Sequence, residues 1–256
     1  MKKLLVLVIA ILLGFASHAQ NRFDSDGEKT GHWEKKYDNG KTRYQGQFEK
    51  GYEIGKFTYY FPNGNVKSIM TFSDKGAKAE VVNFFKTGKK LSTGAYFNKK
   101  KDGVWNFYNI EEKLVKKERF SKGKKDGVWV VYYAESNTVA SEISWKNGMK
   151  DGDWKEYFEN GQLKLTATFV NGKLDGDYRS YFLNKKLARK GKYVAGKQDG
   201  TWISYDDKGG YKSIYVFYMG YVEKETRYED GKMILSIDNK NNKVIDYRNN
   251  EDGGEE

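Results

Sequence analysis

Residues 151–161 read Asp151-Gly152-Asp153-Trp154-Lys155-Glu156-Tyr157-Phe158-Glu159-Asn160-Gly161. In this stretch a Trp stands two positions after an anchoring glycine, a Tyr stands five positions after it, and an Asn-Gly pair follows. Aromatic residues favour a pleated strand, and Asn-Gly supplies the positive φ angles of a tight hairpin turn. The stretch therefore predicts one β-strand and the turn that leaves it.

The same pattern recurs along the chain. Its anchors lie 23 to 25 residues apart, at Gly31, Gly55, Glu80, Gly103, Gly127, Gly152, Gly176 and Gly200. Two positions later stand Trp33, Phe57, Val82, Trp105, Trp129, Trp154, Tyr178 and Trp202. Five positions later, with Lys36 as the exception, stand Tyr60, Phe85, Tyr108, Tyr132, Tyr157, Tyr181 and Tyr205. Seventeen or eighteen positions later stand Phe48, Phe72, Phe97, Phe120, Trp145, Phe169, Tyr193 and Phe217.

Two kinds of turn separate the aromatic runs of each unit. One follows the first run, as in Pro62-Asn63-Gly64; we place the second at the anchor, as in Lys101-Asp102-Gly103 and Lys125-Asp126-Gly127. Each unit then forms two antiparallel strands, and helix is disfavoured because glycines interrupt the sequence so often. The sequence predicts an all-β fold, an elongated single-layer antiparallel β-meander of about eight hairpin repeats with a period of about 24 residues, solenoid-like in its stacking.

The two aromatic positions of the first strand raise a question of geometry. Positions two and five after the anchor differ in parity, so a regular strand points them to opposite faces of the sheet. Either a β-bulge restores one face, or the sheet carries aromatic residues on both sides. The sequence leaves both alternatives open.

The segments outside the repeats have their own signals. Residues 1–19 join Lys2 and Lys3 to an apolar run and the ending Ser17-His18-Ala19, which is typical of a secretory signal peptide cleaved after Ala19. The apolar run is too short to span a membrane. We expect an exported protein, periplasmic or extracellular, with a polar lead-in (20–30), a repeat array (31–231), a C-terminal capping hairpin (232–248) and an acidic flexible tail (249–256).

Composition limits the chemistry. The chain has no cysteine, which excludes disulfides, thiolate metal sites and a cysteine nucleophile. Its formal net charge is +11, and removal of Lys2 and Lys3 leaves +9, which favours anionic partners or surfaces. The aromatic content of 16% is unlike that of a disordered chain. We therefore expect a folded domain in which aromatic rings are the main packing groups.

The units resemble a known repeat. Residues 151–161, followed by Asn171-Gly172-Lys173-Leu174-Asp175-Gly176, are similar to the MORN-type repeat and closest to the bacterial variant in the YwqK-family antitoxin-like group. The resemblance covers about Gly31 to Gly231. It implies a single-layer sheet of hairpins used for protein contacts or, in eukaryotic relatives, proposed to bind acidic lipids. It implies no shared catalytic residue, and the antitoxin label implies neutralisation of a toxin by contact.

Two sets of side chains are candidates for binding. Tyrosine offers a large contact area at low entropic cost, so one candidate interaction face consists of Tyr60, Tyr108, Tyr132, Tyr157, Tyr181 and Tyr205. The alternative role for these rings is core packing. A candidate basic rim, facing lipid phosphates or acidic polysaccharide, consists of Lys99, Lys100, Lys101, Lys124, Lys125, Lys185 and Lys186. The alternative role for these lysines is solubility and protection of sheet edges.

Nothing in the sequence indicates catalysis. His32 is the one histidine after Ala19, and we expect it at the surface or in a turn. The aspartates before the anchors are explained by turns in which Asp bonds its own backbone, and flanking lysines disfavour a calcium role: Asp102, Asp126, Asp151, Asp175 and Asp199. We expect no enzyme, cofactor, metal site or nucleic-acid ligand, and no integral membrane protein.

Three functional hypotheses follow. The first is an exported repeat scaffold that contacts another protein through an aromatic sheet face. The second is a binder of anionic lipid head groups or acidic envelope polysaccharide through the lysine-rich turns. The third is an antitoxin-like protein that neutralises a toxin by direct contact.

Overall fold

The computed structural model describes residues 21–248, so the expected signal peptide (1–19) and acidic tail (249–256) lie outside the described residues. The strands are β1 (Arg22–Phe23), β2 (Lys29–Lys36), β3 (Thr42–Glu49), β4 (Tyr52–Tyr60), β5 (Val66–Ser73), β6 (Lys78–Phe84), β7 (Lys90–Phe97), β8 (Lys100–Tyr108), β9 (Leu114–Ser121), β10 (Lys124–Lys125), β11 (Gly127–Tyr132), β12 (Val139–Lys146), β13 (Met149–Tyr157), β14 (Leu163–Val170), β15 (Lys173–Leu174), β16 (Gly176–Tyr181), β17 (Leu187–Val194), β18 (Lys197–Tyr205), β19 (Tyr211–Tyr218), β20 (Tyr221–Glu229), β21 (Lys232–Asp238) and β22 (Lys243–Asp246).

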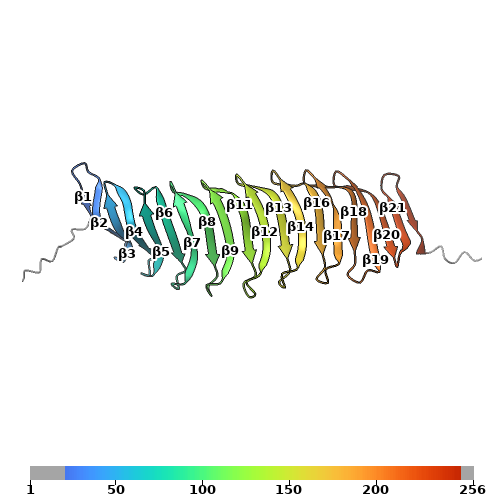
Figure 1. Cartoon of the computed structure of the whole chain (residues 1–256), viewed down its shortest axis with the longest axis horizontal. Helices are drawn as coiled ribbons and strands as arrows, with labels where there is room; N and C mark the ends of the chain where they lie inside the picture. Colours follow the sequence, from blue (N-terminus) through green and yellow to red (C-terminus); the bar gives the residue numbers. More distant parts are fainter. Residues whose placement is uncertain (1–20, 249–256) are drawn as a thin grey trace, which may run out of the picture.

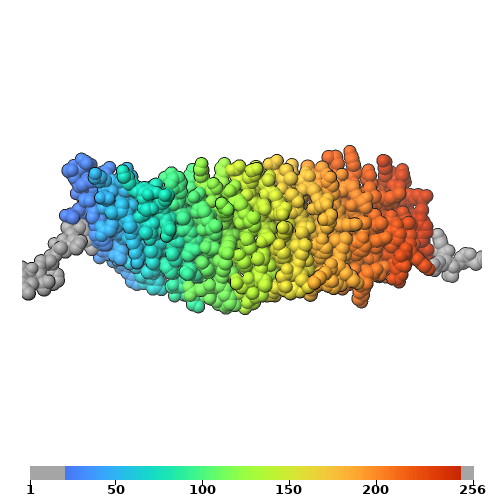
Figure 2. Space-filling view, viewed as in Figure 1, coloured from blue at the N-terminus to red at the C-terminus, as the bar shows by residue number. Residues whose placement is uncertain are grey.

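The strands pair antiparallel in the order of the sequence, and together they form one open sheet (Figure 1). β9 and β14 each pair with two short successive strands, because β10–β11 and β15–β16 are interrupted. Figure 2 shows each stretch of sequence as its own band along the molecule. The predicted all-β, single-layer meander is confirmed. Within residues 21–248 no helix is long and apolar enough to cross a bilayer.

The two faces of the sheet carry different side chains. We call one the aromatic face: it holds the rings two and about seventeen positions after each anchor, such as Phe57 and Phe48, whose centroids lie 5.2 Å apart. We call the other the tyrosine face: it holds the side chains one and three positions after the anchor and the tyrosines five positions after it. The question left open by the sequence is thereby answered, since aromatic residues occupy both faces.

The residue five positions after the anchor lies beside a bulge in the partner strand. This bulge does not change the face of the sheet on which the residue lies. Tyr59 pairs with Ser68 and Tyr60 pairs with Val66, so the extra residue is Lys67, on β5. Tyr59 and Tyr60 therefore keep the alternation of a regular strand. The same shift in register occurs beside Tyr108, Tyr132, Tyr157 and Tyr181.

The anchor glycines form bulges inside strands, so the prediction of a turn at each anchor is wrong. Gly55, with φ +62°, lies within β4. The turn comes four residues earlier, as at Asn147-Gly148, where both residues have positive φ (52° and 93°) and make the two-residue hairpin turn that suits twisted strands. The anchor itself has a positive φ, as Gly55 shows. An L side chain is strained at a positive φ, which explains why the anchor is glycine.

The largest buried rings lie flat on a second, different set of glycines. Phe57, Trp105 and Trp202 are almost fully buried, although no second layer covers them within the described residues. Each lies over a glycine of the preceding strand: a Cβ added at Gly191 would come within 2.1 Å of the Trp202 ring. The backbone below each ring and the neighbouring rings on either side of it thus exclude water, as a second sheet would.

The third unit is displaced by one residue from its predicted alignment. The hairpin of β5 and β6 keeps a continuous register and lacks the anchor bulge, because Phe72 pairs with Ala79. The predicted positions were Glu80, Val82, Phe85 and Phe97. The structural equivalents of the anchor and the three aromatic positions are Ala79, Val81, Phe84 and Tyr96. Ala79 and Val81 are buried, whereas Phe97 is 39% exposed.

Four of the five aspartates that precede the anchors bond to the following unit, whereas we predicted bonds to their own turn. The carboxylate of Asp102 accepts a hydrogen bond from the backbone N of Lys122 at 3.0 Å, and that of Asp151 accepts one from Asn171 at 3.1 Å. Asp175 and Asp199 accept equivalent bonds from Ala195 and Met219. These aspartates therefore stabilise the turn of the following unit and link successive repeats.

We predict that Gly191→Ala lowers the stability of the array. The added Cβ overlaps the Trp202 ring, and overpacking of this kind costs about 1–3 kcal/mol. The midpoint of urea unfolding measures the effect. Gly210→Ala is the matched control, because Gly210 also has no positive φ and its nearest neighbour is an Asp230 side-chain oxygen at 3.4 Å. Equal midpoints for the two variants would contradict the packing described for Trp202.

Candidate interaction faces

The six candidate tyrosines all lie on the tyrosine face and are half-buried. Two of them use their hydroxyls within the sheet. The Tyr60 hydroxyl accepts a hydrogen bond from Gln45 Nε2 at 2.9 Å, and the Tyr157 hydroxyl donates one to Glu142 Oε2 at 3.0 Å. Burial, followed by the bonded Glu142 carboxylate, raises the pKa of Tyr157.

Two further tyrosines lie beneath cations of the neighbouring strand. The Lys90 ammonium is 5.3 Å from the Tyr108 ring centroid, and the Lys117 ammonium is 5.7 Å from that of Tyr132. Tyr181 and Tyr205 continue the row toward the C-terminus. The tyrosines therefore form a ladder, as expected, but most of them are already engaged with the sheet's own side chains.

The aromatic face presents the larger group of rings. In the central units the centroids of Trp129 and Trp145 lie 5.1 Å apart, and Phe120 lies 5.4 Å from Trp129. Trp154 and Phe169 extend the row at 5.7 Å. The three tryptophans are half-buried, unlike Trp105, which is 2% exposed. The middle of the array therefore offers tryptophan surface to a partner.

Lysines lie over these rings at a fixed place in the repeat, two positions before the anchor. The Lys125 ammonium is 4.0 Å from the Trp145 centroid and 4.3 Å from that of Trp129. Lys101 stands over Trp105 at 4.3 Å, and burial lowers its pKa. Sequence reasoning assigned these two lysines to the turns. Their constant distance from the anchor was the signal that could have placed them on the aromatic face.

The candidate basic rim is divided between two edges of the sheet. Lys99, Lys100 and Lys124 are exposed at what we call the short-turn edge, the edge of two-residue turns such as Asn98-Lys99 and Lys122-Gly123. Lys185 and Lys186 are exposed in the turn between β16 and β17, at the opposite edge. Since Lys101 and Lys125 lie over rings, the seven lysines do not share one rim.

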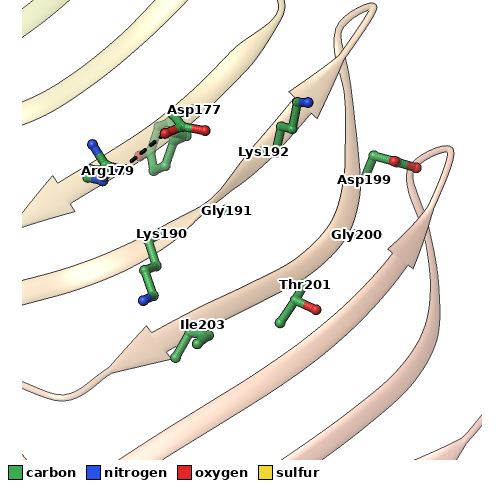
Figure 3. Close-up of a pocket in the computed structure, with 10 residues that line it drawn as sticks. Asp177, Arg179, Lys190, Gly191, Lys192, Asp199, Gly200, Thr201 and Ile203 are labelled. Atoms are coloured by element: carbon green, nitrogen blue, oxygen red, sulfur yellow. Dashed lines mark hydrogen bonds and ion pairs between the residues drawn. The ribbon is translucent and has the colours of Figure 1, made fainter.

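Two carboxylates in the C-terminal half of the array, Asp177 and Asp199, have structural partners. Figure 3 shows an open hollow on the tyrosine face between β16, β17 and β18, with Asp177, Arg179, Lys190 and Asp199 at its sides. Asp177 pairs with Arg179 at 3.0 Å, and Asp199 accepts the bond from the backbone N of Met219.

His32 lies half-buried inside β2, whereas we expected a surface or turn position.

We predict that Lys125→Ala destabilises the array by about 1 kcal/mol, the size of a cation–π interaction with partly desolvated rings. Urea unfolding of the variant measures the loss. Lys124→Ala is the control: this side chain is exposed one residue away, and its removal should change stability by less than about 0.5 kcal/mol. A larger loss for Lys124→Ala than for Lys125→Ala would show that the ring contacts contribute nothing.

We predict that the Tyr59 hydroxyl ionises late. Burial, followed by the charges of Glu53 and Tyr44, raises the pKa of Tyr59 from 10.0 to about 12. The stability that Tyr59 contributes is therefore complete below pH 10 and is lost as the pH rises toward 12, because the unfolded chain ionises first. Ultraviolet absorbance of tyrosinate follows the titration. Tyr59→Phe should remove a late-ionising group, and an unchanged titration curve would contradict the burial described for Tyr59.

Comparisons with known proteins agree with the repeat architecture. Residues 29–50, 53–74, 150–171 and 174–195 match the family model described as a MORN repeat variant. Each segment begins two positions before an anchor glycine, at the place of the ring-covering lysines. A comparison with curated proteins gives no match.

Solved structures share only weak similarity with the chain. A TarM mutant of S. aureus is 11% identical, with a TM-score of 0.29, over 38% of this chain and 19% of that one. A GtfA/B complex is 12% identical, with a TM-score of 0.20, over 48% of this chain and 24% of that one. The chain thus spans about a fifth to a quarter of these proteins, and scores of this size carry no functional argument. What the comparisons establish is that this chain carries MORN-variant repeats in those four segments.

Proposed function

We propose that this protein is an exported, non-enzymatic repeat scaffold that binds another protein through its aromatic face. The observation that carries the proposal is the row of partly exposed tryptophans, Trp129, Trp145 and Trp154, which no other described element covers. Tryptophan is enriched where protein interfaces bind most strongly, and exposed apolar surface rimmed by polar groups marks such interfaces.

The charges around this row indicate the chemistry of the partner. The ammonium groups of Lys125 and Lys150 lie over the rings of Trp145 and Phe169, at 4.0 Å and 4.8 Å. A partner that covers the rings also covers these cations, and it has to supply carboxylates for them. We therefore propose a partner surface that combines apolar and acidic side chains. Export is supported by the signal-peptide pattern of residues 1–19.

A second candidate function is binding to an anionic surface. It is favoured by the exposed lysines of the short-turn edge, Lys99, Lys100 and Lys124. Charge attraction of this kind weakens as salt rises, whereas apolar contact with tryptophan does not. Because the proposed protein partner also pairs charges with Lys125 and Lys150, the lysines that binding requires distinguish the two functions together with salt dependence.

The test compares charge reversals on the two faces. Lys125→Glu with Lys150→Glu changes the aromatic face, and Lys190→Glu with Lys192→Glu makes the same charge change at exposed sites of the tyrosine face. Each variant serves as bait in an envelope extract, with bound proteins identified by mass spectrometry and with folding checked by thermal unfolding. We expect a specific partner to be lost by the first variant and kept by the second. Equal capture by both folded variants would contradict an aromatic-face interface.

Two further measurements complete the test. Retention on anionic vesicles at low salt that disappears at high salt, and in a Lys99→Ala, Lys100→Ala, Lys124→Ala variant, would support the second candidate instead. N-terminal sequencing of protein from the native cell should begin at Gln20. A retained Met1 would contradict export by signal-peptide cleavage.

A further inference from the structure

The row of rings and lysines on the aromatic face is interrupted at the third unit. In four other units a lysine stands two positions before the anchor and lies over the rings; Lys101 stands opposite Tyr96 in this way, and Lys125 opposite Phe120. In the third unit Phe72 faces Ala79. The place two positions before the structural anchor Ala79, which Lys101 occupies in the next unit, is Ala77. Both places at which a lysine could cover the rings are therefore alanine.

A hollow lies where the lysine is missing. Its lining includes the rings of Tyr59, Phe72 and Tyr96 together with Ala77 and Ala79. These rings are held by packing with their neighbours: Phe72 lies 5.2 Å from Phe57, and Tyr96 lies 5.0 Å from Trp105. The hollow is therefore part of the rigid aromatic face.

The hollow also has a carboxylate. Glu53 lines it from β4, at the position two before the anchor that lysine occupies in four other units. Its negative charge is close enough to Tyr59 to contribute to the raised pKa of that hydroxyl. A lysine there would repel a cation, whereas Glu53 attracts one.

From this geometry we infer that the hollow is a binding site for a cationic side chain, a lysine ammonium or an arginine guanidinium presented by a partner protein. The array itself shows the mode of binding one unit away. There the Lys101 ammonium lies 4.3 Å from the Trp105 centroid, 5.3 Å from that of Phe107 and 4.9 Å from that of Phe120. Three rings hold a cation in this way through their negative faces. The third unit has the rings and lacks the cation.

One neighbouring charge acts against the site. Lys99 lines the same hollow from the short-turn edge, and its ammonium repels an incoming cation. Lys99 is exposed, so solvent screens its charge. Removal of Lys99 should therefore strengthen binding.

The inference deepens the proposed function and names a second feature of the same partner. A partner with acidic groups opposite Lys125 and Lys150 would carry a basic residue toward the N-terminal end of the array. Its test uses a small molecule and no partner protein, so the site and the proposed function can fail separately.

The probe is Nα-acetyl-lysine N-methylamide, titrated into the full chain while the aromatic proton resonances are followed by NMR. We expect saturable shifts of the rings of Tyr59, Phe72 and Tyr96, with half-saturation on the order of millimolar, as befits one isolated side chain. The arginine analogue should bind to the same rings. The Nε-acetylated lysine analogue, which has no charge, should give no saturable shift.

Four variants locate the binding. Ala77→Lys supplies the missing lysine and should abolish binding, and Glu53→Gln should weaken it at least about fivefold, a loss of about 1 kcal/mol. Glu49→Gln removes the same charge at an exposed position outside the hollow and should leave binding unchanged. Lys99→Gln should bind more tightly than the original chain. Equal binding of the neutral analogue, unchanged binding by Ala77→Lys, or loss of binding in Lys99→Gln would each overturn the inference.

Discussion

The packing of a large ring against bare backbone is the interaction on which this sheet depends. A single layer has no second sheet to bury its apolar side chains, so each repeat must exclude water with its own strands. Trp202 achieves this by lying on Gly191, with the rings of Tyr193 and Tyr178 at 5.0 Å and 5.3 Å. Both faces of the sheet are consequently free for contacts, and neighbouring repeats are joined by side-chain and backbone bonds between successive turns.

The fold was largely predictable because it repeats. Asn-Gly turns and aromatic residues at constant offsets fixed the hairpins, the period and the single layer. Two features were not predictable from the same pattern. The anchor Asp-Gly pairs look like turns, yet Gly152 lies in a strand, because the positive φ of a bulge needs glycine as much as a turn does. The displacement of the third unit depends on the absence of one bulge, and the one sequence signal for it was Glu80 in place of the anchor glycine.

The candidate site was predicted only in part. The tyrosine ladder exists on one face, but parity alone could not show that a bulge in the partner strand leaves Tyr60 on the face opposite to Phe57. Lys125 looked like a turn residue because lysines are common there. The structure places it over Trp129 and Trp145, where it shapes the charge of the aromatic face. Contacts between residues about twenty positions apart, such as Lys125 and Trp145, decide such positions, and the constant distance of the lysine from the anchor is the one sequence signal for them.

Hydroxyl-radical footprinting of the tryptophans tests most directly whether the aromatic face is open and is buried only by its own strands. The account predicts that Trp105 and Trp202, which are 2% and 0% exposed, stay protected, while Trp129, Trp145 and Trp154 are oxidised in the free protein. Oxidation of all five to the same extent would contradict the packing of rings on glycine. Protection of all five would contradict an open aromatic face.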